Sequence, residues 1–103
     1  MAKLKLQPDP TFKAKVAIPV AGSAPVEVEF TFRHRTKEEL QKFIEDSGKR
    51  DDPDTIMELA AGWELSDQFT RENVDLLVQN YIASARAVFD KYLDELVKAR
   101  LGN

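Results

Sequence analysis

The chain has 103 residues, 43 % of them apolar and 32 % charged, and a formal net charge of −3. This length suits a single domain, 1–103, and the absence of cysteine excludes disulfides and thiolate chemistry. No apolar run approaches the ~18 residues of a membrane span, and residues 1–6 alternate too regularly for a signal peptide. We therefore expect a cytoplasmic protein with no membrane partner.

The charge is distributed unevenly along the chain. Residues 1–35 carry six Lys or Arg against three Asp or Glu, whereas residues 36–103 carry nine against fifteen. Nucleic-acid binding needs a clustered basic face, and this excess is too thin and too spread, so we expect no nucleic-acid partner. A solvated face is the favoured interpretation, and head-to-tail charge complementarity between copies is the weaker alternative.

Alternating apolar residues come first in the chain. From Phe12 to Val20 every second residue is apolar, and from Val26 to Phe32 the pattern repeats after the turn-forming segment 21–25. This period of two predicts a β-hairpin over about residues 11–33. An isolated hairpin is marginal in water, so it must pack on helices or pair with another strand.

The period changes at Thr36, where Thr-Lys-Glu-Glu forms a capping box ahead of a helix that Ser47-Gly48 ends. Asp52 before Pro53 predicts the cap of a second helix. Its apolar positions extend to Trp63, and the glycine at position 62 is expected to end or distort it.

A third helix start lies at Thr70, and no proline or glycine interrupts the chain from there to Leu101. The pattern predicts a long C-terminal helix that Gly102 stops, with a break near Ala83 left open. The predicted fold is α+β: an N-terminal β-hairpin followed by three or four helices within about residues 36–102.

Catalytic and metal-binding patterns are sparse. His34, the only histidine, lies between two arginines with no sign of a nucleophile, so an exposed histidine at the end of a strand is favoured over a catalytic one. The acidic run Asp51-Asp52-Pro53-Asp54 lacks the glycine and distal glutamate of a calcium loop, and helix capping explains it. No glycine-rich phosphate loop is present. We predict no catalytic residue, cofactor or metal, and no enzymatic activity.

Apolar residues of the C-terminal half are candidates for a partner or self-association surface. Packing between helices is the favoured role for the aromatic residues, but the apolar set is wide for a small domain, and part of it is a candidate interface. The candidates are Trp63, Phe69, Tyr81, Phe89, Tyr92 and Leu96.

The segment from about residue 33 to 103 resembles the tail assembly chaperones of long-tailed phages and prophages. The resemblance is carried by Trp63-Glu64-Leu65 with Phe69, by Thr70-Arg71-Glu72-Asn73, by Tyr81 to Ala87, and by Tyr92-Leu93-Asp94-Glu95-Leu96 through Ala99-Arg100-Leu101-Gly102-Asn103. Ile82-Ala83 departs from the family, whose members often place a proline there.

The resemblance implies a chaperone that binds the tape measure protein, keeps it soluble and helps to recruit tail tube subunits around it. It also implies a self-associating homo-oligomer that acts in the host cytoplasm and is absent from the mature virion. The alternative is a small adaptor or regulatory module that binds a protein partner without polymerising.

Overall fold

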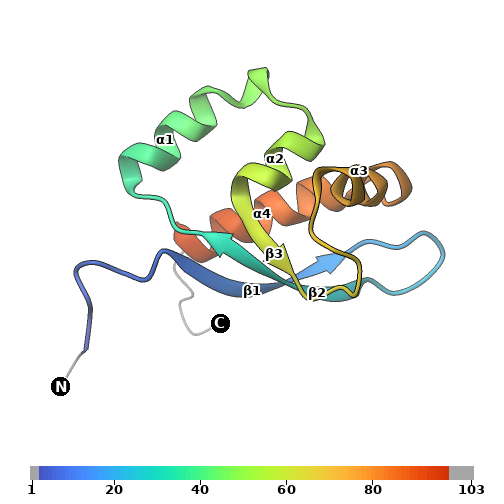
Figure 1. Cartoon of the computed structure of the whole chain (residues 1–103), viewed down its shortest axis with the longest axis horizontal. Helices are drawn as coiled ribbons and strands as arrows, with labels where there is room; N and C mark the ends of the chain where they lie inside the picture. The colour runs from blue at the N-terminus through green and yellow to red at the C-terminus, as the bar shows by residue number, and fades with distance from the viewer. Residues whose placement is uncertain (1–2, 98–103) are drawn as a thin grey trace.

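The computed structural model describes residues 3–97, and these form two layers (Figure 1). A three-stranded antiparallel sheet in the order β1-β2-β3 makes one layer, and four helices cover one face of it. The elements are β1 (Thr11–Ile18), β2 (Val26–Arg33), α1 (Lys37–Glu45), the 3-10 turn η1 (Ser47–Lys49), α2 (Asp52–Leu59), β3 (Ala60–Trp63), α3 (Arg71–Asn80) and α4 (Ser84–Leu96). The α+β class predicted from the sequence is confirmed.

The predicted hairpin is present, and its register runs from Thr11 opposite Arg33 to Ile18 opposite Val26. The first strand ends at Ile18, two residues earlier than its alternation suggested, because Pro19 has no N–H to donate to the ladder. In the connection that follows, Gly22 has a φ of 77°, a conformation that glycine adopts without steric cost.

Side-chain caps begin α1, α2 and α3. Thr36 accepts a hydrogen bond from the Glu39 amide and forms the predicted capping box of α1. In α2 the prediction of Asp52 as cap was wrong by one residue: Asp51 is the cap, and it accepts from the Asp54 amide at 2.9 Å. Pro53 stands in the first turn, where its missing N–H costs nothing.

The predicted end of the second helix was also wrong. The helix stops at Leu59, and residues 60–63 form β3, which pairs with β2 through a register shift near Phe32. Without β3, the free edge of β2 would leave backbone donors and acceptors unpaired beside the core. That tertiary requirement outweighs the helix propensity of the two alanines at the start of the strand. The N-terminal element is therefore a three-stranded sheet rather than a hairpin.

The predicted long C-terminal helix is two helices, α3 and α4, separated by a turn at residues 81–83. One helix over residues 71–96 would be about 39 Å long, whereas a strand of eight residues spans about 26 Å. The turn lets both helices pack on the same sheet. No helix within residues 3–97 is long and apolar enough to cross a membrane. The predicted stop at Gly102 lies outside the described residues.

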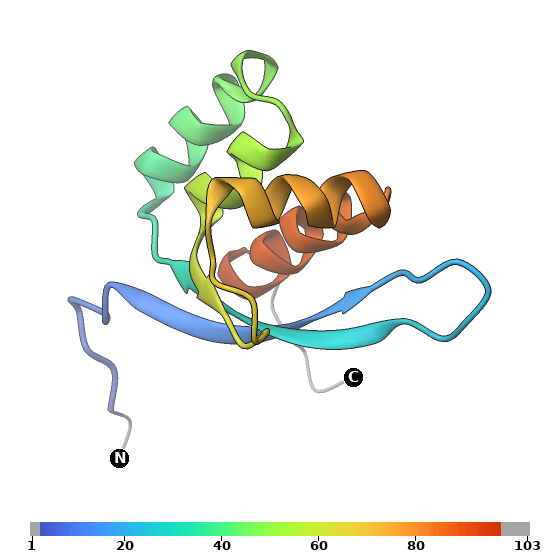
Figure 2. The same ribbon diagram turned by 45° about the vertical axis from the view of Figure 1, so that its right-hand side comes forward.

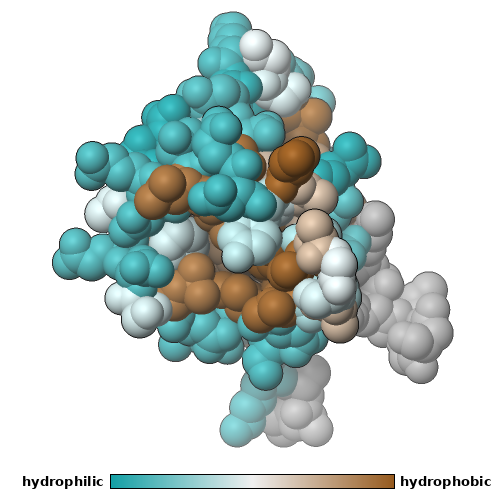
Figure 3. Space-filling view, turned by 90° about the vertical axis from the view of Figure 1, so that its right-hand side faces the viewer, coloured by the Kyte–Doolittle hydropathy of each residue, from teal (hydrophilic) through white to brown (hydrophobic). Residues whose placement is uncertain are grey.

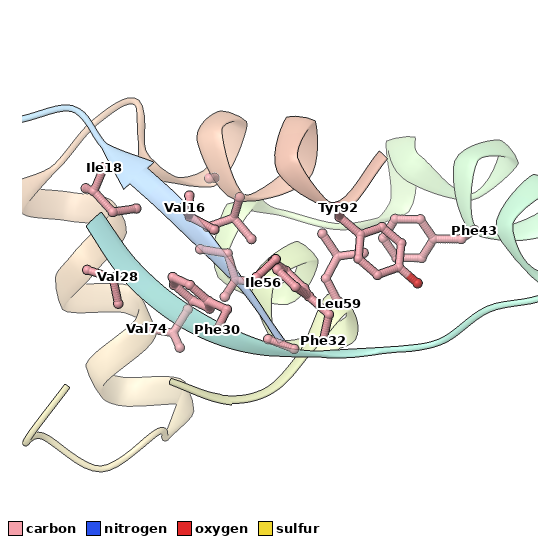
Figure 4. Close-up of a cluster of buried hydrophobic side chains, with 14 of the residues drawn as sticks. Val16, Ile18, Val28, Phe30, Phe32, Phe43, Ile56, Leu59, Val74 and Tyr92 are labelled. Atoms are coloured by element: carbon pink, nitrogen blue, oxygen red, sulfur yellow. The ribbon is translucent and has the colours of Figure 1, made fainter. Parts of the chain in front are cut away.

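The hydrophobic core lies between the sheet and the helices (Figure 4). The inward residues of the hairpin meet buried side chains from α2, α3 and α4, whereas Lys13, Lys15 and Glu29 lie on the outer face of the sheet. Fully buried large side chains in the core are Val16, Phe30, Phe32, Ile56, Leu59, Val74, Val88 and Tyr92.

Candidate functional site: an apolar groove at the hairpin tip

An apolar groove of about 370 Å³ opens at the end of the molecule where the hairpin turns. Its lining comes from the tip of the hairpin, from α3 and from the segment after β3. Figure 2 shows α3 lying above the hairpin at this end of the molecule. We call this apolar groove the tip groove. Its lining comprises Ile18, Val20, Val26, Val28, Trp63, Leu65, Asp67, Asn73, Leu76, Leu77, Asn80 and Tyr81.

Trp63 is held firmly within the groove. Its ring packs edge-on against Phe30 at 6.0 Å and against Phe69 at 5.2 Å between centroids. Its indole N–H donates to the main-chain carbonyl of Asp67 at 2.7 Å. Beyond the ring, the amide of Glu64 donates to the Glu29 carbonyl and extends the sheet. The apolar surface around Trp63 is therefore preformed.

The α3 wall is fixed at its N-terminal end. Thr70 caps the helix by accepting from the Asn73 amide at 3.1 Å, and the Asn73 side chain donates to the Gln68 carbonyl at 2.8 Å. Val74 is fully buried in the core. Leu76, on the outward side of the same helix, keeps 58 % of its surface exposed and borders the groove.

A second, more open hollow adjoins the groove at the turn between α3 and α4. It shares Val20, Asn80 and Tyr81 with the tip groove and adds Ile82, whose side chain is 87 % exposed. In Figure 3, which views this end of the molecule, apolar side chains gather across the middle of the face with polar side chains above and below. The two hollows form one apolar surface.

The charges near the groove are mainly acidic. The segment of residues 64–80 carries four acidic residues and one basic residue, Arg71. That arginine is paired with Asp51 at 3.2 Å and with Asp54 at 2.5 Å. The hairpin connection of residues 19–25 carries no charge. Asp67 lines the groove, and the Glu64 carboxylate accepts a hydrogen bond from the Glu29 amide at 2.7 Å. This end of the molecule therefore favours a basic ligand through its overall charge. The acidic residues of this segment are Glu64, Asp67, Glu72 and Asp75.

The structure brings two of the six candidate surface residues together in the groove, Trp63 and Tyr81. Phe69 is half-buried, and its ring packs edge-on against that of Trp63. Phe89 is half-buried, stacks on Phe43 at 6.5 Å between centroids, and lines a separate hollow of about 310 Å³. Leu96 is half-buried against the core.

Tyr92, the remaining candidate, lies in the core with no exposed surface. Its hydroxyl donates to the Arg33 carbonyl at 2.6 Å and accepts from Arg35 at 3.1 Å. Arg35 also donates to the Glu58 carbonyl and lies over the Phe43 ring. Burial raises the pKa of the Tyr92 phenol. The structure thus gives this residue a role in joining α4 to the sheet.

Groove residues on the hairpin and on the outer side of α3 escaped the sequence analysis. Val20 and Val26 flank the turn and extend the alternation of the strands, so they looked like ordinary strand residues. Leu76 was the sequence signal for an exposed apolar surface, because it lies outside the apolar stripe of α3 to which Val74 and Leu77 belong. An exposed leucine beside a second exposed apolar residue, Ile82, marks the surface.

Histidine and aspartate often serve as acids, bases or metal ligands in other proteins, but the contacts of His34 and Asp51 in this structure are structural. His34 follows β2 and its amide donates to the Pro10 carbonyl at 2.8 Å. Hydrogen bonding from the Asp54 amide and the charge of Arg71 hold the pKa of Asp51 below its ordinary value. Within residues 3–97 no group of three or more His, Cys, Asp or Glu is placed to hold a metal ion.

The sequence profile of one protein family, described as phage tail assembly chaperone, matches residues 1–103. The chain belongs to this family. The match includes the hairpin as well as the C-terminal two thirds on which the resemblance was first seen, so the tip groove lies wholly within the region that the family defines. Comparison of this phage tail assembly chaperone with curated proteins and with solved structures gives no match.

Proposed function

We propose that this phage tail assembly chaperone binds the tape measure protein in the host cytoplasm, keeps it soluble and helps to recruit tail tube subunits around it. The chaperone performs no covalent chemistry. It self-associates reversibly, many copies coat one long client, and it leaves before the virion is complete.

The tip groove is the observation that carries this proposal. Tape measure proteins are long and helical, and an amphipathic helix binds by laying its apolar face in a hydrophobic groove. The preformed groove around Trp63, with exposed Leu76 and Ile82 at its edge, offers such a surface. Its volume of about 370 Å³ admits a few side chains rather than a whole helix. Weak contacts of this kind, repeated along the client, suit reversible coating.

Co-expression with the tape measure protein of the same phage tests this function. The wild-type chaperone is expected to keep the client in the soluble fraction. Leu76→Asp places a charge on the groove wall and is expected to lose this effect, because the client's apolar face cannot solvate a carboxylate. Ile44→Asp is the matched control, since Ile44 is also exposed, at 44 %, but lies on α1 away from the groove.

Equal protection of the client by both variants would contradict the groove as its binding site. If the wild-type protein fails to keep the client soluble and stays monomeric at all concentrations, the chaperone proposal itself falls. The protein would then act as an adaptor for another partner.

A further inference from the structure

An N-terminal arm precedes the sheet and carries two exposed leucines. The arm comprises residues 3–10, and the side chains of Leu4 and Leu6 are 84 % and 95 % exposed. Lys3 and Lys5 alternate with them. In an extended chain this spacing puts both leucines on one side and both lysines on the other. In this structure the arm bends at Leu6 and Gln7, and Lys5 contacts Asp9, so the two faces form when the arm straightens. Within residues 3–97 neither leucine is covered.

We propose that the arm of one copy occupies the tip groove of the next copy, with its two leucines against the apolar wall formed by Leu76 and Tyr81. This inference rests on the proposed function, because it assigns to the same groove a second use that regulates client binding. The contact links copies head to tail.

Chain length favours an arm from another copy. Leu6 lies five residues before Thr11 and can extend at most about 18 Å from it. The Ile18 end of the groove lies beyond β1, whose eight residues span about 26 Å. The arm and the hairpin tip also lie at opposite ends of the molecule (Figures 1 and 2). Leu6 therefore cannot reach that end of its own groove.

Charge complementarity favours the same pairing. The arm brings Lys3 and Lys5 to an end of the molecule where residues 64–80 contribute four acidic residues and a single arginine that is already paired. Within one chain Lys5 is paired with Asp9 at 2.7 Å, but both side chains are largely exposed, so this bond exchanges easily. Opposite charges at the two ends favour head-to-tail association and disfavour two arms meeting.

The arrangement has two consequences. A contact between different ends of identical molecules is heterologous and does not close on itself unless the rotation between copies allows a ring, so it generates open chains. Arm and client also compete for one groove, so client binding releases the neighbouring copy and self-association limits client binding.

Mixing two variants tests the contact by analytical ultracentrifugation. Leu6→Asp disrupts the arm and leaves the groove intact. Leu76→Asp disrupts the groove and leaves the arm intact. Wild type is expected to form oligomers that grow with concentration, and each variant alone to associate at least about tenfold more weakly. Their equimolar mixture is expected to form dimers and nothing larger, because only one intact arm meets one intact groove. Gln7→Ala, a substitution one residue along the arm that removes neither a leucine nor a charge, is the control and is expected to associate as wild type.

A disulfide trap locates the contact, because the chain has no cysteine of its own. Under mild oxidation, equimolar Leu6→Cys and Leu76→Cys proteins are expected to cross-link to each other at least about fivefold more than Leu6→Cys does to Ile44→Cys. Equal cross-linking to both positions would overturn the proposal, and so would oligomers of wild-type size in Leu6→Asp or a mixture that remains monomeric.

Client solubility separates this inference from the proposed function. Leu6→Asp is expected to protect the tape measure protein at least as well as wild type, because its groove is intact and has no competing arm. If Leu6→Asp protects the client but also associates like wild type, the arm contact is wrong and the chaperone function stands. If the two-variant mixture forms dimers while wild type never protects the client, the contact stands and the function is wrong.

Discussion

The hydroxyl of Tyr92 donates a hydrogen bond to the main-chain carbonyl of Arg33 at 2.6 Å and so joins α4 to the end of β2. The same oxygen accepts from Arg35, whose guanidinium lies 4.5 Å from the centroid of the Phe43 ring. One phenol thus connects the sheet, α4 and, through Arg35, α1. This junction holds the layers that position the groove at the opposite end of the sheet.

Tyr92→Phe is expected to lower the free energy of unfolding by about 1–3 kcal/mol, because it leaves the Arg33 carbonyl and an Arg35 donor without their partner. Urea denaturation followed by circular dichroism measures the change. Tyr81→Phe is the control: its side chain is 39 % exposed at the groove, and we expect a change within about 0.5 kcal/mol. Equal effects of the two substitutions would contradict the role given to the junction.

Stability is expected to fall at alkaline pH because of Tyr92. Burial raises the pKa of its phenol above the ordinary value of 10.0, so the folded state holds the proton more tightly than the unfolded state. The contribution is complete below pH 10 and is lost as pH rises through the folded-state pKa. Urea midpoints measured at several pH values above 9 should fall more steeply for wild type than for Tyr92→Phe. Parallel profiles would refute this assignment.

At acidic pH the Asp51 carboxylate is expected to contribute. Its pKa is lowered by the Asp54 amide and by Arg71, so its stabilising effect is present above the ordinary value of 3.8 and disappears as pH falls through the lower folded-state value. Asp51→Asn keeps a good helix cap but removes the charge. The variant should show a shallower loss of thermal stability between pH 5 and pH 2. An unchanged acid profile would exclude this carboxylate as a contributor.

Ser84→Ala is expected to stabilise the protein by up to about 1 kcal/mol or to leave it unchanged. The Ser84 hydroxyl is buried at the start of α4 and has no hydrogen-bond partner within residues 3–97, so its removal relieves a desolvation cost. Alanine also has the higher helix propensity. Thermal unfolding measures the effect. A loss of more than 1 kcal/mol would show that the hydroxyl is bonded in solution.

Local signals predicted the parts of the fold that local interactions determine. The alternation of the two hairpin strands and the caps at Thr36 and Thr70 depend on residues close in sequence, and these predictions are confirmed. β3 depends on the free edge of β2, about thirty residues earlier in the chain, so the helical pattern up to Trp63 was misleading. The sequence left open a break near Ala83, and the structure places it at residues 81–83, between α3 and α4.

The candidate surface was predicted only in part for a related reason. Aromatic residues such as Trp63 and Tyr92 look alike in sequence, yet one lines the groove and the other is enclosed between layers. Whether an aromatic residue lines the groove or is enclosed in the core depends on which elements pack over it, and this is set by the tertiary structure. Smaller residues complete the groove, and one of them, Leu76, gave the sequence signal for it because it lies off the apolar stripe of α3.

Hydrogen exchange of the chaperone alone, at a concentration at which it is monomeric, and bound to its tape measure protein tests the central claim most directly. Amides of residues 18–28 and 73–82 form or flank the groove, and we expect their exchange to slow in the complex while that of α1 is unchanged. Slower exchange confined to α1 or α4, with the hairpin tip and α3 unaffected, would show that the client binds elsewhere and would contradict the account.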